Sequence, residues 1–421
     1  MLAILATHPI QYQVPLWQAL ANEGSVPFEV WYLSDHGSRP SFDRQFGKTF
    51  EWDLNTLDGY PYRFLQSPAN MDVSGFAAAR VQESLQDLFK ERKTTALWVQ
   101  GWQVAAYWQA VWKAHGAGIS VWLRGDSNDL ARTSLPRKIM KRILLGQFFR
   151  RTNHFLYVGA ANRRFYEEYG VQTQQLHPAP HCVDNERFAK QAKSLSGERE
   201  NIRRSWGIPE NAFCVLFAGK LIPKKRPFDL IAAAQQSRAR QADRPLHLLF
   251  AGSGELGREL RRASHVVFDA ERPDIQSDTL QKHDAERPSA SFAGFLNQSD
   301  ISKAYVAADC LALPSDSRET WGLVVNEAMA SGLPCVVSDA CGCSEDLAGP
   351  INPTLRFPLG DIRAIVDGLT LLMRHRIPPS VLREQISKFS VSASVETVKR
   401  LYPLAMAERT LSYPAMRNAF N

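Results

Sequence analysis

Short apolar runs alternate with helical patterns along almost the whole chain. In the first half, continuous apolar runs predict strands at 2–7, 28–34, 96–100, 119–124 and 154–159. Amphipathic spacing predicts helices between and after these strands, at 12–22, 77–91, 103–115, 136–150 and 160–169. Repeated strand–helix units with fully apolar strands indicate an α/β fold, in which helices cover both faces of a parallel sheet.

The alternation stops at a polar stretch after Val183 and then restarts. The second series predicts strands at 213–218, 247–251, 291–293, 310–313 and 334–338, and helices at 227–240, 255–262, 299–308, 322–331 and 361–375. Two Rossmann-like domains are therefore expected, with their parallel sheets facing a central cleft where ligands of such folds bind. The expected boundaries are 1–185 for the first domain, 186–204 for a linker, 205–390 for the second domain with a surface insertion at 263–290, and 391–421 for a helical tail that returns to the first domain.

The composition is that of a globular protein with a net charge of +7. Of its 421 residues, 44% are hydrophobic and 22% are charged, and no apolar run approaches the roughly 18–20 residues that span a bilayer. The chain starts with a pattern typical of a strand rather than of a signal peptide. The six cysteines are too irregularly spaced for a disulfide framework, and Cys341 and Cys343 lack a second pair at zinc-ligand spacing. We therefore expect a cytoplasmic protein without a bound metal.

The strongest chemical signal lies between Pro314 and Ser338. An apolar strand ends at Pro314 and a helix is predicted to begin near Gly322, where free backbone N–H groups and the positive end of the helix dipole favour a phosphate. Glu319 precedes this helix and Glu327 lies in its second turn, and both carboxylates can accept hydrogen bonds from sugar hydroxyls. Taken singly, each glutamate is better explained structurally, Glu319 as a helix cap and Glu327 as a solvated helix residue.

A second signal follows the strand at 213–218. Lys220, Lys224, Lys225 and Arg226 stand at the turn between that strand and the next helix, where they can neutralise a diphosphate leaving group without a metal. No Asp-x-Asp pair is present to hold a divalent ion for that task. A basic surface loop is the alternative interpretation.

Glycines mark two further strand ends in the second half. Gly-Ser-Gly stands at 252–254 and Gly-Phe-Leu at 294–296. Both are predicted to face the same cleft, where a backbone without side chains can approach a base or a ribose. Each motif alone is weak evidence, because such glycines often mark only a tight turn.

These motifs occur in the order of a known family. Gly-Lys-Leu at 219–221 with Lys225, Gly-Ser-Gly, Gly-Phe-Leu, and Glu319 with Glu327 followed by Ala-Met-Ala-Ser-Gly-Leu-Pro at 328–334 resemble the family 4 retaining glycosyltransferases, the glycosyl transferases group 1, which have the GT-B fold. The resemblance covers the second domain apart from the insertion at 263–290. It is specific because four motifs appear in the right order.

The resemblance implies a role for each donor-side residue. Lys220 and Lys225 would hold the diphosphate, Glu319 the hydroxyls of the donor sugar, and Glu327 the ribose. The remaining donor-binding residues are Gly219 and Gly254, Phe295 and Leu296 beside the base, and the backbone of Trp321, Gly322, Leu323 and Val324 beside the sugar and phosphate. The implied reaction is a front-face displacement with retention, in which the leaving phosphate assists deprotonation of the acceptor and no metal is required.

The first half resembles a subset of the same family, the bacterial polysaccharide glycosyltransferases. The segments that carry this likeness are Thr7–Tyr12, Trp52-Asp53, Gly59-Tyr60, Arg124–Asn128 and His181–Asn185. This half departs from the broader family in two places. His8–Tyr12 replaces the usual glycine-rich loop, and Arg124-Gly125-Asp126 stands where many members carry a histidine.

Two residues of the first half are candidates for chemistry on the acceptor, and with Glu319 they make up the predicted catalytic set. We expect Asp126 to orient the acceptor hydroxyl or to stabilise positive charge at the sugar, although an Asp at this place is also a common N-cap or Asx turn. His8 is a titratable group at a strand end, with a structural histidine as the alternative. The residues expected to line the acceptor side are Gln11, Tyr12 and Arg124.

The predicted helix at 136–151 has an unusual charge. From Arg132 to Arg151 there are seven basic residues and no acidic one, interleaved with apolar side chains. Such a basic amphipathic helix favours contact with an anionic membrane surface. The alternative is that its apolar face packs on the sheet while its charges are solvated.

Together these features predict a retaining, metal-independent glycosyltransferase without a cofactor. It would move a sugar from a nucleotide-sugar donor to a glycan or lipid-linked glycan acceptor in polysaccharide biosynthesis, in the cytoplasm or on the inner face of the cytoplasmic membrane. The alternative is a catalytically inactive relative that serves as a binding subunit of a polysaccharide assembly complex. A dinucleotide-dependent oxidoreductase is excluded because neither half has Gly-x-Gly-x-x-Gly after a first strand. No nucleic-acid partner is expected, since no recognised binding module is present.

Overall fold

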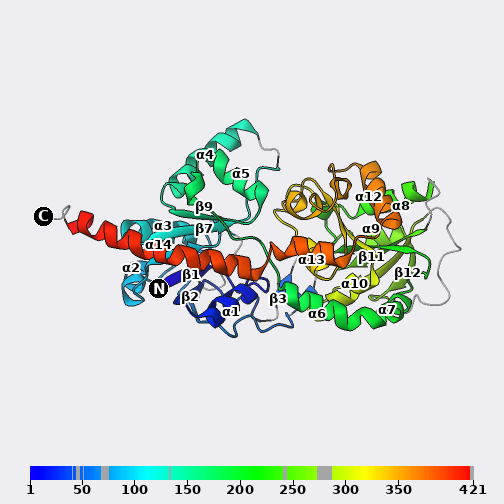
Figure 1. The fold of residues 1–421 in the computed structure, drawn as a ribbon, viewed down its shortest axis with the longest axis horizontal. Coiled ribbons are helices and arrows are strands. Elements are labelled where there is room, and N and C mark those ends of the chain that lie inside the picture. Colours follow the sequence, from blue (N-terminus) through cyan, green and yellow to red (C-terminus); the bar gives the residue numbers. More distant parts are fainter. Residues whose placement is uncertain are drawn as a thin grey trace. The chain divides into compact units, whose positions relative to one another are not determined.

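The computed structural model divides into two compact units (Figure 1). It describes residues 1–39, 41–43, 48–50, 52–67, 75–131, 134–239, 244–272 and 287–417. The first unit consists of Met1–Ser41, Leu54–His181 and Ser390–Asn421, and the second of Phe42–Asp53 and Cys182–Phe389. A short segment of the N-terminal half therefore belongs to the second unit, and the end of the chain belongs to the first.

The first unit is built on a parallel sheet whose strands are apolar throughout. Within the described residues its order is β5-β2-β1-β6-β7-β8-β9. The strands are β1 (Leu2–Ala6), β2 (Phe28–Tyr32), β5 (Tyr62–Phe64), β6 (Ala96–Val99), β7 (Ser120–Gly125), β8 (His154–Tyr157) and β9 (Leu176–Pro178). Every pairing between them is parallel, which requires a crossover after each strand and explains the alternation with helices.

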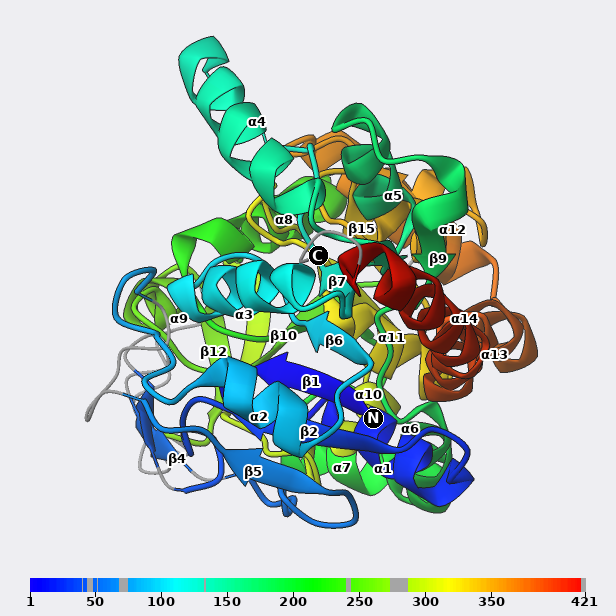
Figure 2. The same cartoon turned by 90° about the vertical axis from the view of Figure 1, so that its left-hand side faces the viewer.

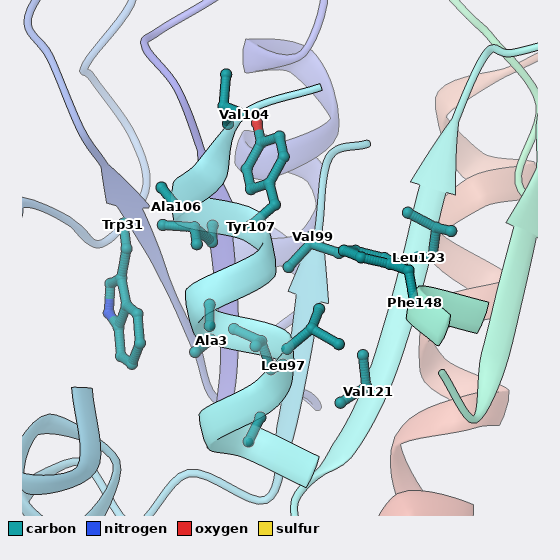
Figure 3. Packing of buried hydrophobic residues seen from close by; sticks show 14 of the residues in the cluster. Ala3, Trp31, Leu97, Val99, Val104, Ala106, Tyr107, Val121, Leu123 and Phe148 are labelled. Carbon is teal, nitrogen blue, oxygen red and sulfur yellow. The ribbon is translucent and has the colours of Figure 1, made fainter. Parts of the chain in front are cut away.

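Helices cover both faces of this sheet, so that alternate residues of a strand enter different cores. The helices are α1 (Val14–Glu23), α2 (Leu85–Glu91), α3 (Ala105–Gly116), α4 (Leu135–Phe149), α5 (Ala160–Glu168) and α14 (Val391–Arg417). On one face Ala3 and Val99 pack against Tyr107 of α3 (Figure 3). On the other face Ile4 packs in a cluster with α1 and with Leu401 of α14. The tail thus supplies part of the core of the first unit.

The second unit repeats the architecture. Its main sheet, within the described residues, has the order β12-β13-β11-β10-β14-β15-β16. The strands are β10 (Phe213–Ala218), β11 (Leu246–Ala251), β12 (His265–Asp269), β13 (Ser289–Gly294), β14 (Cys310–Leu313), β15 (Cys335–Ser338) and β16 (Arg356–Phe357), and a separate pair is formed by β3 (Ser41–Asp43) and β4 (Lys48–Phe50). The helices are α6 (Asn185–Leu195), α7 (Arg199–Ser205), α8 (Phe228–Ala239), α9 (Gly257–Arg262), α10 (Ile301–Ala307), α11 (Leu323–Ala330), α12 (Ile362–Arg374) and α13 (Pro379–Ser387).

The structure differs from the sequence prediction at the edges of both sheets. The edge strands β5, β9, β12 and β16 were not predicted, because none of them contains a continuous apolar run longer than three residues. The stretch 263–290 was predicted as a surface insertion, but it includes β12 and the beginning of β13, and residues 273–286 lie outside the described part. The predicted linker at 186–204 is helical, since it contains most of α6 and α7.

Candidate functional site

Three loops lie against one another at the carboxyl ends of β10, β11 and β13. Backbone hydrogen bonds join them, from Gly219 N to Ala251 O (2.9 Å), from Leu221 N to Ser253 O (2.9 Å) and from Gly252 N to Gly294 O (2.7 Å). The three glycine motifs found in the sequence are therefore neighbours in space. In parallel sheets of this type, ligands bind at the carboxyl ends of the strands.

The glycines of these loops are required by close backbone approach. Gly252 has φ +142°, and a Cβ there would lie 2.0 Å from the carbonyl oxygen of Gly219. Gly254 has φ +153°, and its Cβ would lie 2.6 Å from the carbonyl oxygen of Leu221. The Gly-x-Gly motif therefore has a structural reason here, which is the contact between two strand-end loops.

The helix α11 begins at Gly322, which serves as its N-cap residue with φ +105°. A Cβ at this position would lie 2.7 Å from Cδ2 of Leu313 and 3.3 Å from Sγ of Cys343. Only glycine fits, so the chain enters the helix tightly packed against the end of β14. The first turn of any helix presents backbone N–H groups without intrahelical partners, and here they belong to the segment predicted to bind phosphate.

Lys225 and Glu319 form an ion pair between the two strongest sequence motifs. Their side chains are 15% and 14% exposed. Lys225 ends the short helical turn Pro223–Lys225, and the backbone N–H of Asp316 donates to the carbonyl of Lys224 at 2.8 Å. The loop after β10 and the loop ahead of α11 are thus joined by main chain as well as by charge.

The structure excludes the interpretation of Glu319 as a helix cap. No side-chain hydrogen bond caps α11, so Glu319 is not its cap. The backbone of Glu319 is held at both ends, since its N–H donates to the carbonyl of Asp316 (2.9 Å) and its carbonyl accepts from Gly342 (3.2 Å). The carboxylate instead meets the ammonium of Lys225.

Glu327 lies in a polar cluster rather than in solvent. Its Oε2 accepts a hydrogen bond from the hydroxyl of Tyr305 on α10. Burial raises the pKa of Glu327, while the Tyr305 hydrogen bond and the charge of Arg187 act in the opposite direction. Arg187 is itself oriented by the backbone carbonyl of Gln298 at 3.0 Å. The carboxylate is therefore held in one place.

The side chain of Trp321 is part of the core. Its indole N–H donates to Oδ1 of Asn326 at 2.9 Å, and the indole packs against Phe389 with ring centroids 5.7 Å apart. Both Trp321 and Asn326 are buried. The neighbouring Leu323 and Val324 are partly exposed on the first turn of α11.

A segment from the N-terminal half lies on the loop after β13. The ring centroids of Trp52 and Phe295 are 6.4 Å apart, and the backbone N–H of Ser299 donates to Oδ2 of Asp53 at 2.8 Å. Phe295 and Leu296, predicted to lie beside the base, are both partly exposed. In the sequence, Trp52-Asp53 was noted only as part of the family resemblance and was given no role. A local pattern does not show which unit a segment packs against.

In the first unit, His8 is a largely neutral histidine. Its Nδ1 lies 2.9 Å from Oγ1 of Thr7, and its ring meets that of His36 edge-on at 5.1 Å. Burial and the neighbouring His36 lower the pKa of His8 to about 4. His8 is therefore available as a proton acceptor near pH 7 and not as a cation.

Asp126 lies beside a second histidine that the sequence had not singled out as a site residue. Its Oδ2 is 4.0 Å from Nε2 of His181, and the Asp126 side chain is 47% exposed. The ring of Tyr12 packs edge-on against His181 with centroids 6.2 Å apart. Burial, with a further contribution from Asp126, raises the pKa of Tyr12 to about 12.

Arg124 has a structural role in the same region. Its guanidinium donates to the carbonyls of Ala179 (3.1 Å) and Pro180 (3.0 Å), and the residue is buried. It thereby fixes the chain just ahead of His181, whose pKa is lowered by burial and by the charge of Arg124. Gln11, also predicted on the acceptor side, is partly exposed on the loop that carries Tyr12.

The candidate residues of the described part form no metal site, and those predicted to bind the donor do not line the large cavity of the second unit. Within the described part of the chain, no group of three or more His, Cys, Asp and Glu side chains is arranged to hold a metal ion. A cavity of about 950 Å³ is lined by Phe213, the first residue of β10, and by Pro334, which precedes β15. It therefore opens at the amino ends of the strands, and none of the predicted donor-binding residues lines it.

Residues 198–389 match the family model described as "Glycosyl transferases group 1". This range contains every donor-side motif described above. The second unit is a glycosyl transferases group 1 domain. In this domain the glycine motifs meet at the ends of β10, β11 and β13, and Lys225 pairs with Glu319 ahead of α11. Glu327 lies in the cluster with Tyr305.

Curated relatives are similar over more than half of the chain. The chain is 27% identical over 245 residues to a GDP-mannose-dependent alpha-mannosyltransferase from Mycobacterium tuberculosis, which covers 58% of this chain and 52% of the relative. It is 29% identical over 251 residues to D-inositol 3-phosphate glycosyltransferase 2 from Catenulispora acidiphila, with 58% and 54% covered. The chain thus spans about half the length of the curated relatives it matches.

Solved structures are similar over nearly the whole chain. HepE from Anabaena, in complex with UDP and glucose, superimposes with a TM-score of 0.60 at 15% identity, covering 95% of this chain and 98% of the other. WaaG, a glycosyltransferase involved in lipopolysaccharide biosynthesis, gives a TM-score of 0.54 at 14% identity, covering 98% and 99%. These likenesses confirm the predicted fold, GT-B, with two Rossmann-like units.

Proposed function

We propose that the protein is a retaining glycosyltransferase that moves a sugar from a nucleotide-sugar to a glycan or lipid-linked glycan in polysaccharide biosynthesis. The observation that carries this proposal is the Lys225–Glu319 ion pair, which lies just ahead of the tightly packed start of α11 at Gly322. A cation, a carboxylate and a helix N-terminus meet there. This combination suits a sugar diphosphate, which carries negative charge next to hydroxyl donors.

The named relatives support the class of donor. One is called GDP-mannose-dependent, and HepE has been solved with UDP and with UDP-glucose. For this chain we propose a nucleotide-sugar donor without assigning its base or its sugar. The loop of Phe295 and Leu296 takes the base, and Glu327 takes the ribose.

In the proposed donor complex the Lys225 ammonium moves from Glu319 to the diphosphate. Lys220 and the first-turn N–H groups of α11 share the phosphate charge, so that the leaving group departs as a stabilised nucleoside diphosphate. Glu319 is then free to accept a hydrogen bond from a hydroxyl of the sugar. Binding of the donor therefore also releases Glu319 from its ion pair with Lys225.

The transfer itself breaks the bond from the anomeric carbon to the phosphate oxygen and forms a bond from that carbon to the acceptor oxygen on the same face. The acceptor hydroxyl gives its proton to the departing phosphate oxygen, which balances the reaction without a metal ion. On the acceptor side we propose that Asp126 and His8 orient the hydroxyl, with Tyr12 and Gln11 beside them. His8, with a pKa of about 4, can accept a hydrogen bond at neutral pH.

We place the reaction in the cytoplasm, on the inner face of the cytoplasmic membrane when the acceptor is lipid-linked. A catalytically inactive binding subunit is the second candidate, favoured by the absence of the family's mid-domain histidine at Arg124-Gly125-Asp126. The two candidates differ in turnover and not in donor binding.

Incubation of the purified protein with a panel of nucleotide-sugars distinguishes an active glycosyltransferase from an inactive binding subunit. We expect one donor to release its nucleoside diphosphate, and Glu319→Ala to lower that turnover by at least about 10²-fold, because the glutamate supports the transition state. Asp126→Asn tests the acceptor side, and an unchanged kcat there would return Asp126 to a capping role. Donor binding without turnover by the wild-type protein would favour the binding subunit.

A further inference from the structure

The helix α4 carries a row of large apolar side chains in solvent. Its C-terminal turn is packed in the core of the first unit, through the buried side chains Leu145, Phe148 and Phe149. Its first turns extend away from the sheet of that unit (Figures 1 and 2). The apolar side chains exposed there are Leu135 (70%), Ile139 (52%), Met140 (59%), Ile143 (64%) and Leu144 (53%).

These five side chains share one half of the helix surface. With about 3.6 residues per turn, Leu135, Ile139 and Ile143 follow one another on one line, and Met140 and Leu144 follow on the adjoining line. The same geometry puts the basic side chains on the opposite half. These are Arg137, Lys138, Lys141 and Arg142.

α4 packs on the first unit only near its C-terminal end, while Arg137, Lys138 and Arg142 are exposed. Leu145, Phe148 and Phe149 lie on the same half of the helix as Lys141, whose Nζ is 4.8 Å from the ring centroid of Phe165. The apolar row therefore points away from the core of the first unit. The alternative interpretation of this helix was that its apolar face packs on the sheet. Such packing explains why the last turn is buried, but it does not explain the exposed apolar side chains of residues 135–144.

The charges around the apolar side chains of α4 indicate which kind of surface they bind. From Leu130 to Tyr166 the chain contains no acidic residue, and an acid on α5, Glu168, lies 3.8 Å from Lys138. An apolar half-cylinder about ten residues long with cations on its other half is the arrangement of a helix that lies in a bilayer interface. Its apolar half enters the acyl boundary, and its lysines and arginines reach phosphate headgroups.

We propose that α4 is the membrane-docking element of this protein, inserting Leu135, Ile139, Met140, Ile143 and Leu144 into the surface of an anionic phospholipid bilayer. No helix of the described residues is long and apolar enough to cross a membrane. The docking is therefore peripheral. The purpose of this docking, which is to bring the enzyme to a lipid-linked acceptor, rests on the proposed function. The contact with lipid itself does not depend on sugar transfer.

The test is sedimentation of the full-length protein with vesicles, in the absence of any nucleotide-sugar. Vesicles of phosphatidylcholine with phosphatidylglycerol should bind the wild-type protein, and vesicles of phosphatidylcholine alone should bind it more weakly. The double variant Ile139→Glu/Ile143→Glu should partition at least about tenfold less, since withdrawing one large aliphatic side chain from water already changes partitioning by about that factor. Both residues are exposed, so the fold is retained.

A matched control introduces the same charges elsewhere. Val381 and Leu404 are exposed apolar residues on α13 and α14, and Val381→Glu/Leu404→Glu should bind vesicles as the wild type does. The variant Arg137→Glu/Arg142→Glu should lose the preference for anionic vesicles. Donor binding should be unchanged in the α4 variants, so that loss of membrane docking is distinguished from failure of the proposed function.

Two results would overturn the proposal. One is a wild-type protein that does not sediment with anionic vesicles, and the other is an Ile139→Glu/Ile143→Glu variant that sediments as well as the wild type. If the wild-type protein does not bind vesicles but dimerises through these residues in sedimentation velocity, the apolar row covers a second copy of the chain.

Discussion

Lys225 and Glu319 lie 94 positions apart in the chain and form an ion pair that is mostly shielded from solvent. Each belongs to a loop at the carboxyl end of a different strand, β10 for the lysine and β14 for the glutamate. The pair places opposite charges next to each other at the ends of these two strands. In the donor complex that we propose, a diphosphate takes over the lysine and a sugar hydroxyl donates to the glutamate.

The strand-end loops depend on glycine at position 252. Gly252→Ala adds a Cβ 2.0 Å from the carbonyl oxygen of Gly219 at φ +142°, so the free energy of unfolding should fall by about 2 kcal/mol or more. Gly146→Ala is the control, because that glycine lies within α4 with open space around it, and the change should stabilise by about 0.5–1 kcal/mol. Denaturant unfolding measures both. Equal effects of the two changes would mean that the contact between the loops is not required.

His8 gives the first unit a pH-dependent stability. Its pKa is about 4 in the fold, against 6.5 for an ordinary solvated histidine, so the unfolded chain binds more protons between these values. The contribution of neutral His8 is complete above about pH 6.5 and is lost as the pH falls towards about 4. We expect the difference in unfolding free energy between wild type and His8→Asn to be larger near pH 7.5 than near pH 5. A difference that does not change with pH would show that His8 is not desolvated.

Trp52 tests whether the segment it belongs to serves the donor site. Its ring lies against Phe295, on the loop proposed to take the base. Trp52→Ala should weaken binding of the donor nucleotide by about tenfold, the lower range for an aromatic side chain stacked with a base. Trp52→Phe should retain most of the affinity, and Trp112→Ala, which removes a partly exposed tryptophan of α3, should have no effect. Unchanged affinity in Trp52→Ala would leave this residue a purely structural role.

The sequence was sufficient for the elements and residues that local patterns determine. Buried strands such as β1 and β10 are continuous apolar runs, and the glycine and lysine motifs stand directly at their ends. The edge strand β16 was missed because two residues form no pattern. The predicted boundaries of α11 and α12 differ from the structure by one residue at each end.

The sequence could not show which side chains from distant positions lie next to each other. The hydrogen bond from Tyr305 to Glu327 joins two helices, and the approach of Asp126 to His181 joins two loops. Neither follows from spacing along the chain. In α4 one apolar face was expected, whereas Phe148 and Ile143 lie on opposite halves of the helix, and only Phe148 is buried.

Titration calorimetry with a panel of nucleoside diphosphates tests the central claim most directly. We predict that one nucleoside diphosphate binds the wild-type protein at a single site and that Lys225→Met weakens this binding at least about tenfold, because a charge-assisted contact with phosphate is lost. Lys399→Met removes a partly exposed cation of α14 that pairs with Glu23 and Glu396, and it should bind nearly as the wild type does. Absence of binding by the wild-type protein, or equal affinity in Lys225→Met, would contradict the assignment of this loop to the donor diphosphate.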